Sequence, residues 1–277
     1  MMFLRMKTVC ALLALTGCVF AAENTLTPEE KKAGYKLLFD GKTMKNWRDP
    51  AKQIVPGDAW KIEDGTLTTV SKPHIEEDLL TEKSYGDFEL KFDWKISPGG
   101  NTGLKYRIQR EIFFISPAER LGAGSFEALI GRTIKNPPDR KALKPDQKGA
   151  VYTVAFEFQL IDDERHRDAQ RGALYQTGAL YSMIPAKAKA AKPAGEWNSS
   201  LLRLKGDHFE HWVNGTKVLE GSLTDPTIAA GAEKRWGKSA PEVSDLLSSP
   251  KRQGPFSLQH HGDPVWFRNI KIHELKK

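Results

Sequence analysis

Four polar side chains near the middle of the chain have types and spacing suited to acid–base chemistry. The segment Val154–Asp163, VAFEFQLIDD, alternates as a strand does, with three apolar side chains on one face. Glu157 and Gln159 then share the other face, and Asp162 and Asp163 follow where the strand should end. On a cleft floor, such a carboxylate and amide could move a proton and hold a polar ligand. The alternative is a solvated strand face followed by a turn.

Two more segments carry candidates for the same chemistry. In Gly103–Gln109, alternation puts Lys105, Arg107 and Gln109 on one face, where a cation could stabilise a developing negative charge. Gln259 and His261 share a face in a later strand, and histidine ordinarily titrates near neutral pH, as a general base should. Solvated strand faces and a structural histidine are the alternatives.

A divalent metal is a further hypothesis. Glu157, Gln159, Asp162 and His261 could form a ligand set that suits a hard, oxygen-preferring ion better than zinc. No dense ligand spacing in the sequence requires a metal, so the cofactor is left open.

The elements that must position these residues are mostly strands. Asp87–Ile96, DFELKFDWKI, alternates cleanly over ten positions, and Asp64-Gly65 and Asn214-Gly215 are turn pairs between short apolar runs. Thr177–Ser182 is predicted to be another short strand. About a dozen such strands without βαβ alternation predict an all-β antiparallel sandwich.

Two long excursions interrupt this pattern. Glu111–Gly149 contains four prolines and scattered charges, and is predicted to be irregular with one short helix. Asp225–Gln253 is predicted to be helical at Pro241–Leu247. Excursions of this length are usually functional or mobile.

The start of the chain resembles an export signal. Two basic residues precede a short apolar core within residues 1–22. Ordinary cleavage after Ala21 and a lipobox at Leu15–Cys18, which would make Cys18 a lipid anchor, both remain open. We therefore expect an exported bacterial protein, periplasmic or membrane-anchored, with a leader linker over 23–34 and one domain over 35–277.

Composition narrows the choice of partner. The 277 residues are 39% hydrophobic and 28% charged, as in a soluble globular protein. The net charge of +7 is spread along the chain without a basic block, which argues against a nucleic-acid partner. Both cysteines, Cys10 and Cys18, lie in the leader, so the domain has no disulfide and must rely on its core.

A series of short motifs resembles one known family, the bacterial 3-keto-disaccharide hydrolase domain. The resemblance spans about Tyr35 to Leu275. The motifs, in chain order, are FDGK at Phe39–Lys42, EDG at Glu63–Gly65, GGNTG at Gly99–Gly103, FEFQ at Phe156–Gln159, TGALY at Thr177–Tyr181, GEWN at Gly195–Asn198, and VWFRNI at Val265–Ile270.

The resemblance implies a concanavalin/LamG-like jelly roll of two curved antiparallel sheets. It also implies an exported protein that acts on an oxidised glycoside or disaccharide, by hydrolysis or by elimination and hydration. Two features depart from the family: the Glu111–Gly149 excursion is longer than usual, and His260 stands where the family pattern has Asp.

The chemistry implied by the resemblance assigns roles to the candidates. A ketone at sugar carbon 3 acidifies the carbon 2 proton, and its removal gives an enolate that expels the aglycone from carbon 1. His261 is the candidate base, Lys105 or Arg107 would hold the enolate oxygen, and Glu157 would protonate the leaving group. The candidate substrate-binding residues are Asn101, Gln159, Asp162, Gln259, and, for stacking on a sugar ring, Tyr181 and Trp47.

Two alternatives stand beside this hypothesis. A lectin-like, non-catalytic carbohydrate-binding module would use the same fold. Ordinary glycoside hydrolysis would need a carboxylate pair, Glu157 with Asp93 or Asp162. The oligomeric state and the aglycone have no signal in the sequence.

Overall fold

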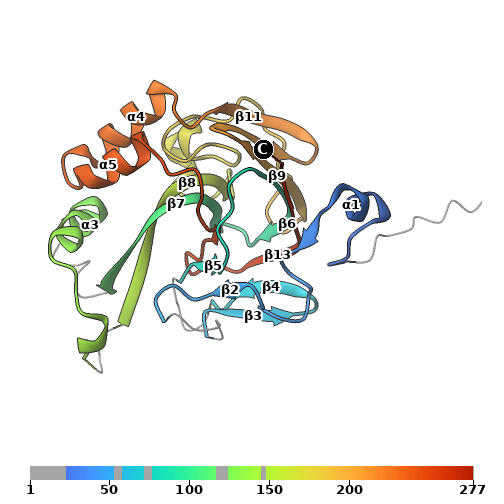
Figure 1. The fold of residues 1–277 in the computed structure, drawn as a ribbon, viewed down its shortest axis with the longest axis horizontal. Helices are drawn as coiled ribbons and strands as arrows, with labels where there is room; N and C mark the ends of the chain where they lie inside the picture. The colour runs from blue at the N-terminus through green and yellow to red at the C-terminus, as the bar shows by residue number, and fades with distance from the viewer. Residues whose placement is uncertain (1–22, 53–57, 72–76, 117–123, 145–147, 277) are drawn as a thin grey trace, which may run out of the picture.

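Two antiparallel sheets build the protein, which confirms the predicted sandwich (Figure 1). The computed structural model describes residues 23–52, 58–71, 77–116, 124–144 and 148–276. The eight-stranded sheet has the order β11-β10-β9-β6-β13-β4-β3, with β1 paired to β13. The bounds of its strands are β1 Lys36–Leu37, β3 Trp60–Glu63, β4 Thr66–Thr69, β6 Phe88–Ile96, β9 Asn198–Lys205, β10 His208–Val213, β11 Thr216–Ser222 and β13 Val265–Glu274.

The five-stranded sheet carries the segment that opened the sequence analysis. Its order is β2-β5-β12-β7-β8. The bounds of its strands are β2 Trp47–Arg48, β5 Leu79–Thr81, β7 Asn101–Ser116, β8 Lys148–Ile161 and β12 Ser257–Leu258.

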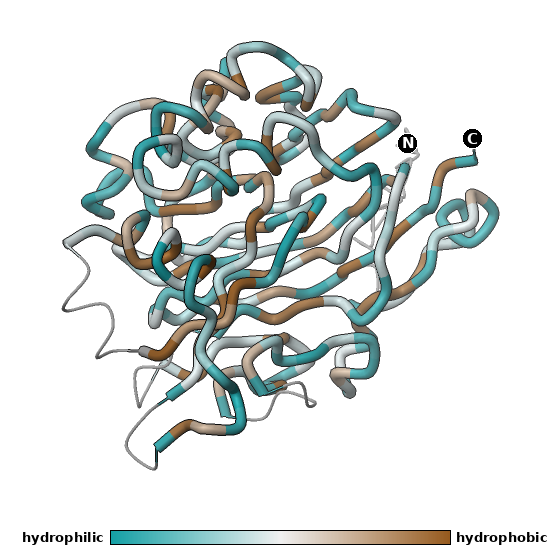
Figure 2. Tube along the Cα trace, turned by 60° about the vertical axis from the view of Figure 1, so that its left-hand side comes forward, coloured by the Kyte–Doolittle hydropathy of each residue, from teal (hydrophilic) through white to brown (hydrophobic). Residues whose placement is uncertain are grey.

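The core lies between the two sheets. Burial alternates residue by residue along β6, as its sequence predicted, and the same alternation of apolar and polar residues is visible along the strands in Figure 2. Phe92 of β6 meets Phe158 of β8 edge to face, with ring centroids 6.2 Å apart. Each such fully buried side chain contributes roughly 1.5–3 kcal/mol. The inward face of β8 therefore fixes the direction in which Glu157 points, away from the core.

Helices lie at two ends of the molecule. α1 (Pro28–Ala33) begins with a capping box between Thr27 and Glu30, as the sequence predicted. α3 (Phe126–Lys135), α4 (Pro226–Ala232), a π-helical turn η4 (Glu233–Gly237) and α5 (Pro241–Ser248) lie on the side where β7 and β8 run (Figure 1). Three 3-10 turns complete the set: η1 Arg140–Ala142, η2 Ala169–Arg171 and η3 Ala173–Tyr175. Within the described ranges, no helix has the length and apolar character needed to cross a membrane.

The segment over 23–34 is attached to the sandwich. Asn24 and Asn269 exchange hydrogen bonds, the Asn24 amide N–H donating to the Asn269 Oδ1 at 2.6 Å and the Asn269 N–H donating to the Asn24 Oδ1 at 2.9 Å. Glu30 accepts from Lys271 Nζ at 2.8 Å. The part of the expected linker that the structure describes is thus held against β13.

Two element predictions were wrong. Thr177–Ser182 forms turns and isolated bridges rather than a strand, because Leu180 pairs only singly with Phe158 and Ile184. The Glu111–Gly149 excursion is less irregular than expected: β7 continues to Ser116 and β8 starts at Lys148, so their hairpin extends well beyond the sheet.

A β-bulge divides this long hairpin. The pairing of β7 with β8 shifts between Tyr106 and Arg110, and Arg107 adopts a positive φ of 52°. A bulge bends and twists the strand that carries it. The bulge therefore separates the part of the hairpin that belongs to the sheet from the part that projects beyond it.

Candidate active site

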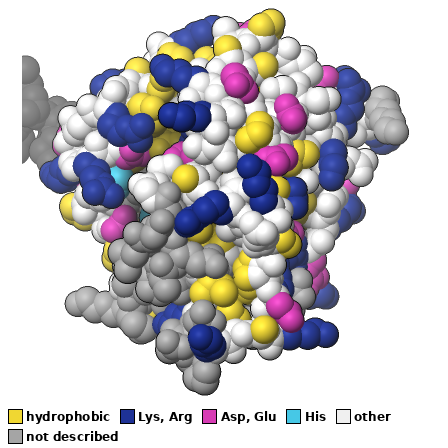
Figure 3. Space-filling view, turned by 90° about the vertical axis from the view of Figure 1, so that its left-hand side faces the viewer, with side chains coloured by type: hydrophobic (Ala, Val, Ile, Leu, Met, Phe, Trp, Pro, Cys, Tyr) yellow, Lys and Arg dark blue, Asp and Glu magenta, His cyan; other side chains and the backbone are white. Residues whose placement is uncertain are grey.

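A cavity of about 1130 Å³ opens on the five-stranded sheet. Its lining includes six of the predicted residues: Asn101, Lys105, Glu157, Tyr181, Gln259 and His261. Figure 3 faces this side of the molecule and shows basic side chains crowded together with acidic side chains and a histidine. The cavity thus brings these six predicted residues together with other side chains that the sequence analysis did not single out.

Glu157 and Lys105 form the centre of the site. They are directly opposite each other on β8 and β7. Burial raises the pKa of Glu157 to about 7, although the positive charges of Lys105 and Arg235 act to lower it. A carboxyl that titrates near neutral pH can both accept and return a proton.

Asp78 keeps Lys105 charged. Lys105 is buried, and its Nζ donates to the Asp78 Oδ2 at 3.1 Å. Burial alone would lower the pKa of Lys105, but the charges of Asp78, Tyr152 and Glu157 outweigh it, and the pKa lies above its ordinary value. Asp78 also accepts from Ser257 Oγ at 3.1 Å. The site therefore holds a fixed ammonium beside a titratable carboxyl.

Two amides and one glycine complete the floor. Oriented with its nitrogen towards the acceptors, the Gln159 amide donates to Glu157 Oε1 at 2.9 Å. The Gln259 side chain also hydrogen-bonds Glu157, and its own Oε1 is buried without a hydrogen-bond partner. Gly103 lies between them: a Cβ there would stand 2.6 Å from Gln259 Oε1 and 2.9 Å from Glu157 Oε1. The floor therefore needs the absence of a side chain at 103.

Residues missed by the sequence analysis also line the site. Arg235 comes from the π-helical turn η4, a conformation often found at functional sites. Its guanidinium lies 5.4 Å from the Tyr181 ring and pairs with Glu127 at 3.2 Å. The Tyr181 hydroxyl donates to the Asp168 Oδ2 at 2.7 Å, and burial raises the pKa of Tyr181. Asp78, Tyr152 and Asp168 also line the cavity.

Arg107 does not join Glu157. The bulge removes it from the face that it was predicted to share with Lys105. Its guanidinium is buried outside the cavity lining and donates to the Gly206 carbonyl at 2.6 Å and the Lys251 carbonyl at 3.3 Å. Gln109 points to the same region, with its Oε1 accepting from the Lys251 N–H at 2.6 Å. Arg107 therefore holds the bulge in place in this structure.

Three other candidates are also placed outside the cavity lining. Trp47 is buried, and its Nε1 donates to the Leu38 carbonyl at 2.8 Å, so its ring faces no sugar. Asp162 caps the turn after β8, accepting from Gly99 N–H at 2.7 Å and from Glu164 N–H at 3.1 Å. Asp93 lies on the eight-stranded sheet, bound to Asn269 at 2.7 Å. Neither proposed carboxylate partner therefore faces Glu157.

His260 and His261 differ in burial. His260 is buried, with its ring edge to face against Trp60 at 5.6 Å and its Nδ1 accepting from the Gly262 N–H at 2.9 Å. His261 is exposed where it lines the cavity, on the same side as Gln259. The residue that replaces the family's Asp thus serves packing at this edge.

The expected metal-ligand set is not assembled, because Asp162 lies in the turn. Among the described residues, two other groups of ligand-type side chains come together. Asp49, Asp58 and Glu77 already surround Lys52, whose Nζ lies 2.5 Å from Asp58 and 2.9 Å from Glu77.

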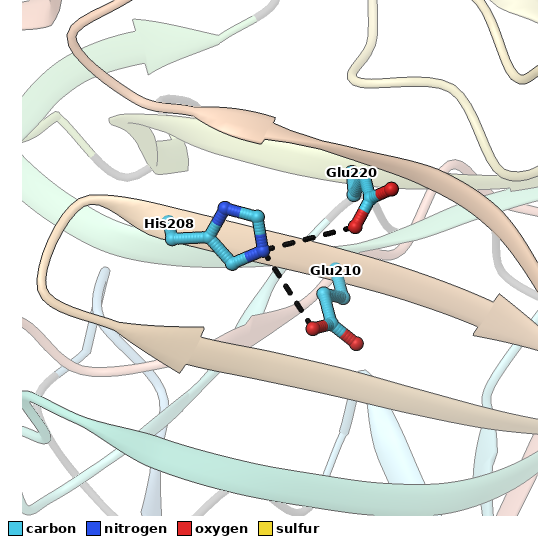
Figure 4. A group of neighbouring side chains, drawn as sticks. All are labelled: His208, Glu210 and Glu220. Carbon is cyan, nitrogen blue, oxygen red and sulfur yellow. Dashed lines mark ion pairs between the residues drawn. The ribbon is translucent and has the colours of Figure 1, made fainter.

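The second group lies on the other sheet. His208, Glu210 and Glu220 point towards one another in Figure 4, with His208 Nε2 3.6 Å from Glu210 and 3.9 Å from Glu220. Lys217 pairs with Glu220 at 2.6 Å and Arg203 with Glu210 at 3.9 Å. Both groups therefore hold cations of the chain itself.

Comparison with known proteins identifies the family of the chain. The model of the 3-keto-alpha-glucoside-1,2-lyase-like domain family matches residues 34–273. The chain belongs to this family. A 3-keto-disaccharide hydrolase from Bacteroides thetaiotaomicron is 32% identical over 255 residues, which cover 87% of this chain and 79% of that protein.

Solved structures give the same result for the fold. One protein from Parabacteroides distasonis, inferred to be a glycosyl hydrolase, is 28% identical, with a TM-score of 0.67 over 92% of this chain and 100% of the other. A second from the same organism is 25% identical, with a TM-score of 0.55 over 87% and 99%. These relatives make the chain a member of a carbohydrate-hydrolase family and confirm the sandwich expected from the sequence motifs.

Proposed function

We propose that the protein cleaves 3-keto-glycosides by removing the proton at sugar carbon 2. The observation that carries the proposal is the pair at the cavity centre: a carboxyl with a pKa of about 7 opposite an ammonium that a second carboxylate keeps charged. Membership of the 3-keto-alpha-glucoside-1,2-lyase-like family supports the same substrate class.

The first step assigns one role to each member of the pair. The Glu157 carboxylate takes the carbon 2 proton, and the electrons of that bond form the enolate of the carbon 3 ketone. Lys105 donates a hydrogen bond to the enolate oxygen, where the negative charge develops. Gln259, with its orphaned Oε1, accepts from a sugar hydroxyl.

The second step releases the aglycone. The enolate electrons form a double bond between carbons 1 and 2, and the bond from carbon 1 to the aglycone oxygen breaks. His261, or Tyr181, protonates that oxygen from the cavity wall. Water then adds its hydroxyl to carbon 1 and gives its other proton back to the group that protonated the aglycone, while Glu157 returns its proton to carbon 2, so that the overall reaction is hydrolysis. Without that addition, the protein is a lyase.

The test uses a 3-keto-glucoside with a chromophoric aglycone, beside the same glucoside unoxidised. Release from the keto substrate alone, with a primary isotope effect on kcat/KM for substrate deuterated at carbon 2, is the expected result. Equal release from both substrates would support direct hydrolysis, and saturable binding of plain glycans without release would support a lectin-like module. Release of the aglycone in the presence of EDTA would show that the reaction does not depend on a metal ion.

We also propose that the protein is exported. The basic and apolar order of residues 1–22 and the lipobox-like Leu15–Cys18 support this. Mass spectrometry of the mature protein from a bacterial host distinguishes cleavage after Ala21 from a diacylated Cys18, and retention of residues 1–22 would contradict both.

A further inference from the structure

The cavity has two chemically different ends. Around Glu157 the lining is polar and charged. Towards the projecting part of the β7–β8 hairpin it becomes mainly apolar, in a wall formed by Phe113, Phe126, Leu143, Ala150, Val151 and Tyr152. All of these except Phe113 are partly exposed. Three of these six residues, Phe113, Phe126 and Leu143, lie within the Glu111–Gly149 excursion, and the other three open β8 directly after it. Glu127, Lys148 and Arg140 also line the cavity here, and the Arg140 guanidinium lies 4.4 Å from the Phe113 ring.

The apolar wall is preformed by aromatic packing. Phe126, at the first turn of α3, meets Tyr152 of β8 edge to face, with ring centroids 5.1 Å apart. Trp236 of the π-helical turn supports Tyr152 from behind at 5.4 Å, and Phe114 of β7 supports Phe126 at 6.3 Å. Four separate elements, α3, β7, β8 and η4, thus hold these rings, so a ligand would pay little to order them.

Tyr152 marks the junction between the two ends. Its ring lies 5.0 Å from Lys105 Nζ on one side and contacts Phe126 on the other. A sugar whose carbon 2 meets Glu157 therefore directs one of its substituents along the apolar wall. Carbon 1 and carbon 3 both neighbour carbon 2, and Lys105 takes the oxygen of carbon 3 in the proposed reaction, so we assign the wall to the substituent on carbon 1, which is the leaving group.

We propose that the apolar wall is a leaving-group subsite for a planar aromatic aglycone, so that this protein acts on aryl or arylalkyl glycosides in preference to disaccharides. The proposal rests on the proposed function for its orientation. A second sugar would leave the apolar wall uncovered and lose the polar contacts of its hydroxyls there, whereas an aromatic ring covers the wall and packs edge to face with Phe126 or Tyr152.

The first measurement compares kcat/KM for the 3-keto forms of benzyl glucoside, methyl glucoside and a glucosyl-glucose disaccharide. Benzyl alcohol and methanol are leaving groups of nearly equal acidity, so a difference between them reports binding rather than reactivity. We expect the benzyl compound to be favoured over the methyl compound by about 10–100-fold. A methyl or disaccharide substrate processed as well as the benzyl one would overturn the proposal.

Variants test whether the apolar wall causes the preference for the benzyl substrate. Leu143→Ser changes a partly exposed side chain at the end of η1, and Phe126→Ala removes the aromatic edge. Each should reduce the benzyl preference at least about fivefold and leave turnover of the methyl compound unchanged. Ile134→Ala is the matched control, because Ile134 lies on the same helix as Phe126 but outside the cavity lining. Loss of preference in the control alone, or in no variant, would contradict the proposal.

A binding experiment tests the leaving-group subsite independently of the proposed reaction. Calorimetry measures unoxidised benzyl and methyl glucosides against the wild-type protein and Leu143→Ser. Benzyl-selective binding that Leu143→Ser weakens, without turnover of any keto substrate, would support the subsite and reject the proposed reaction. Turnover of every keto substrate with equal binding of the two glucosides would support the reaction and reject the subsite.

Discussion

Two groups of charged side chains, one on each sheet, differ in what surrounds them. The group on β10 and β11, His208 with Glu210 and Glu220, lies at the surface, and water can solvate His208 and Glu220. The group on β7 and β8, Glu157 with Lys105 and Asp78, lies within a cavity. Water screens the first, whereas burial raises the pKa of Glu157 in the second. The same residue types thus serve different purposes in the two places.

The comparison teaches that pairing alone does not identify a functional site. The shortest ion pair of the surface group, Lys217 with Glu220 at 2.6 Å, is shorter than the buried pair of Lys105 with Asp78 at 3.1 Å. Only the buried group would leave an uncompensated charge if one member were removed, and that cost follows from desolvation.

The largest expected effect is on turnover by Glu157→Gln. Because the amide cannot accept the carbon 2 proton, kcat/KM on a 3-keto-glucoside should fall by about 10²–10⁴-fold. The same variant should be more stable than the wild type at pH 8, because the wild-type protein must bury the ionised Glu157 carboxylate. At pH 4 the two proteins should be equally stable, because Glu157 is protonated in both the folded and the unfolded wild type. Chemical denaturation at both pH values checks this. Full activity would remove Glu157 from the mechanism.

Next in size is the loss of the buried cation. Lys105→Met leaves Asp78 and Glu157 facing each other without an ammonium, and the free energy of unfolding should fall by about 3–5 kcal/mol. Lys217→Met is the matched change in the surface group, and its melting temperature should equal that of the wild type. If both variants melt alike, the contrast between the two groups is not real.

The pH dependence of turnover should sharpen the contrast. In the wild type, kcat/KM should rise with pH through about 7, as Glu157 loses its proton. The groups that act on this carboxyl are Lys105, Arg235 and Asp78, and the charge of Asp78 raises its pKa. Asp78→Asn should therefore move the rise to lower pH by up to about one unit. A profile that moves upward would contradict this account of the site.

The smallest expected effect belongs to the surface histidine. His208→Ala should leave the melting temperature unchanged at physiological salt, and any difference at low salt should disappear near 1 M, where screening acts over a few ångströms. Differential scanning fluorimetry across salt concentrations suffices. A loss of 3-keto-glucoside turnover in His208→Ala would contradict this expectation, because His208 and Glu157 lie on different sheets.

Local patterns were sufficient for most of the sandwich. Alternation placed Glu157 on the open face of β8, and turn pairs such as Asp64-Gly65 placed the hairpins. The same two-residue alternation correctly predicted the face on which Lys105 lies, because β7 is regular up to Tyr106. Side chains beside a regular strand can thus be assigned from sequence alone.

The remaining site residues depend on contacts that no local pattern encodes. Asp78 and Arg235 come from segments far from β8 in sequence, and only the three-dimensional fold brings them to Glu157. Arg107 was misplaced because residues 107–109 bulge opposite the single residue Ala155, which interrupts the alternation of the strand. Trp47 was misplaced because its type does not tell a core ring from one at a cavity rim.

The geometry of the site depends on the absence of a side chain at Gly103. Replacing it by alanine is a conservative change by most measures, yet the new carbon would displace the Glu157 and Gln259 side chains. A single substitution at this position should therefore abolish the reaction and leave the strand and the sandwich unchanged. Within the family, we therefore expect a relative with a larger side chain at this position to keep the fold and to lose the cleavage reaction.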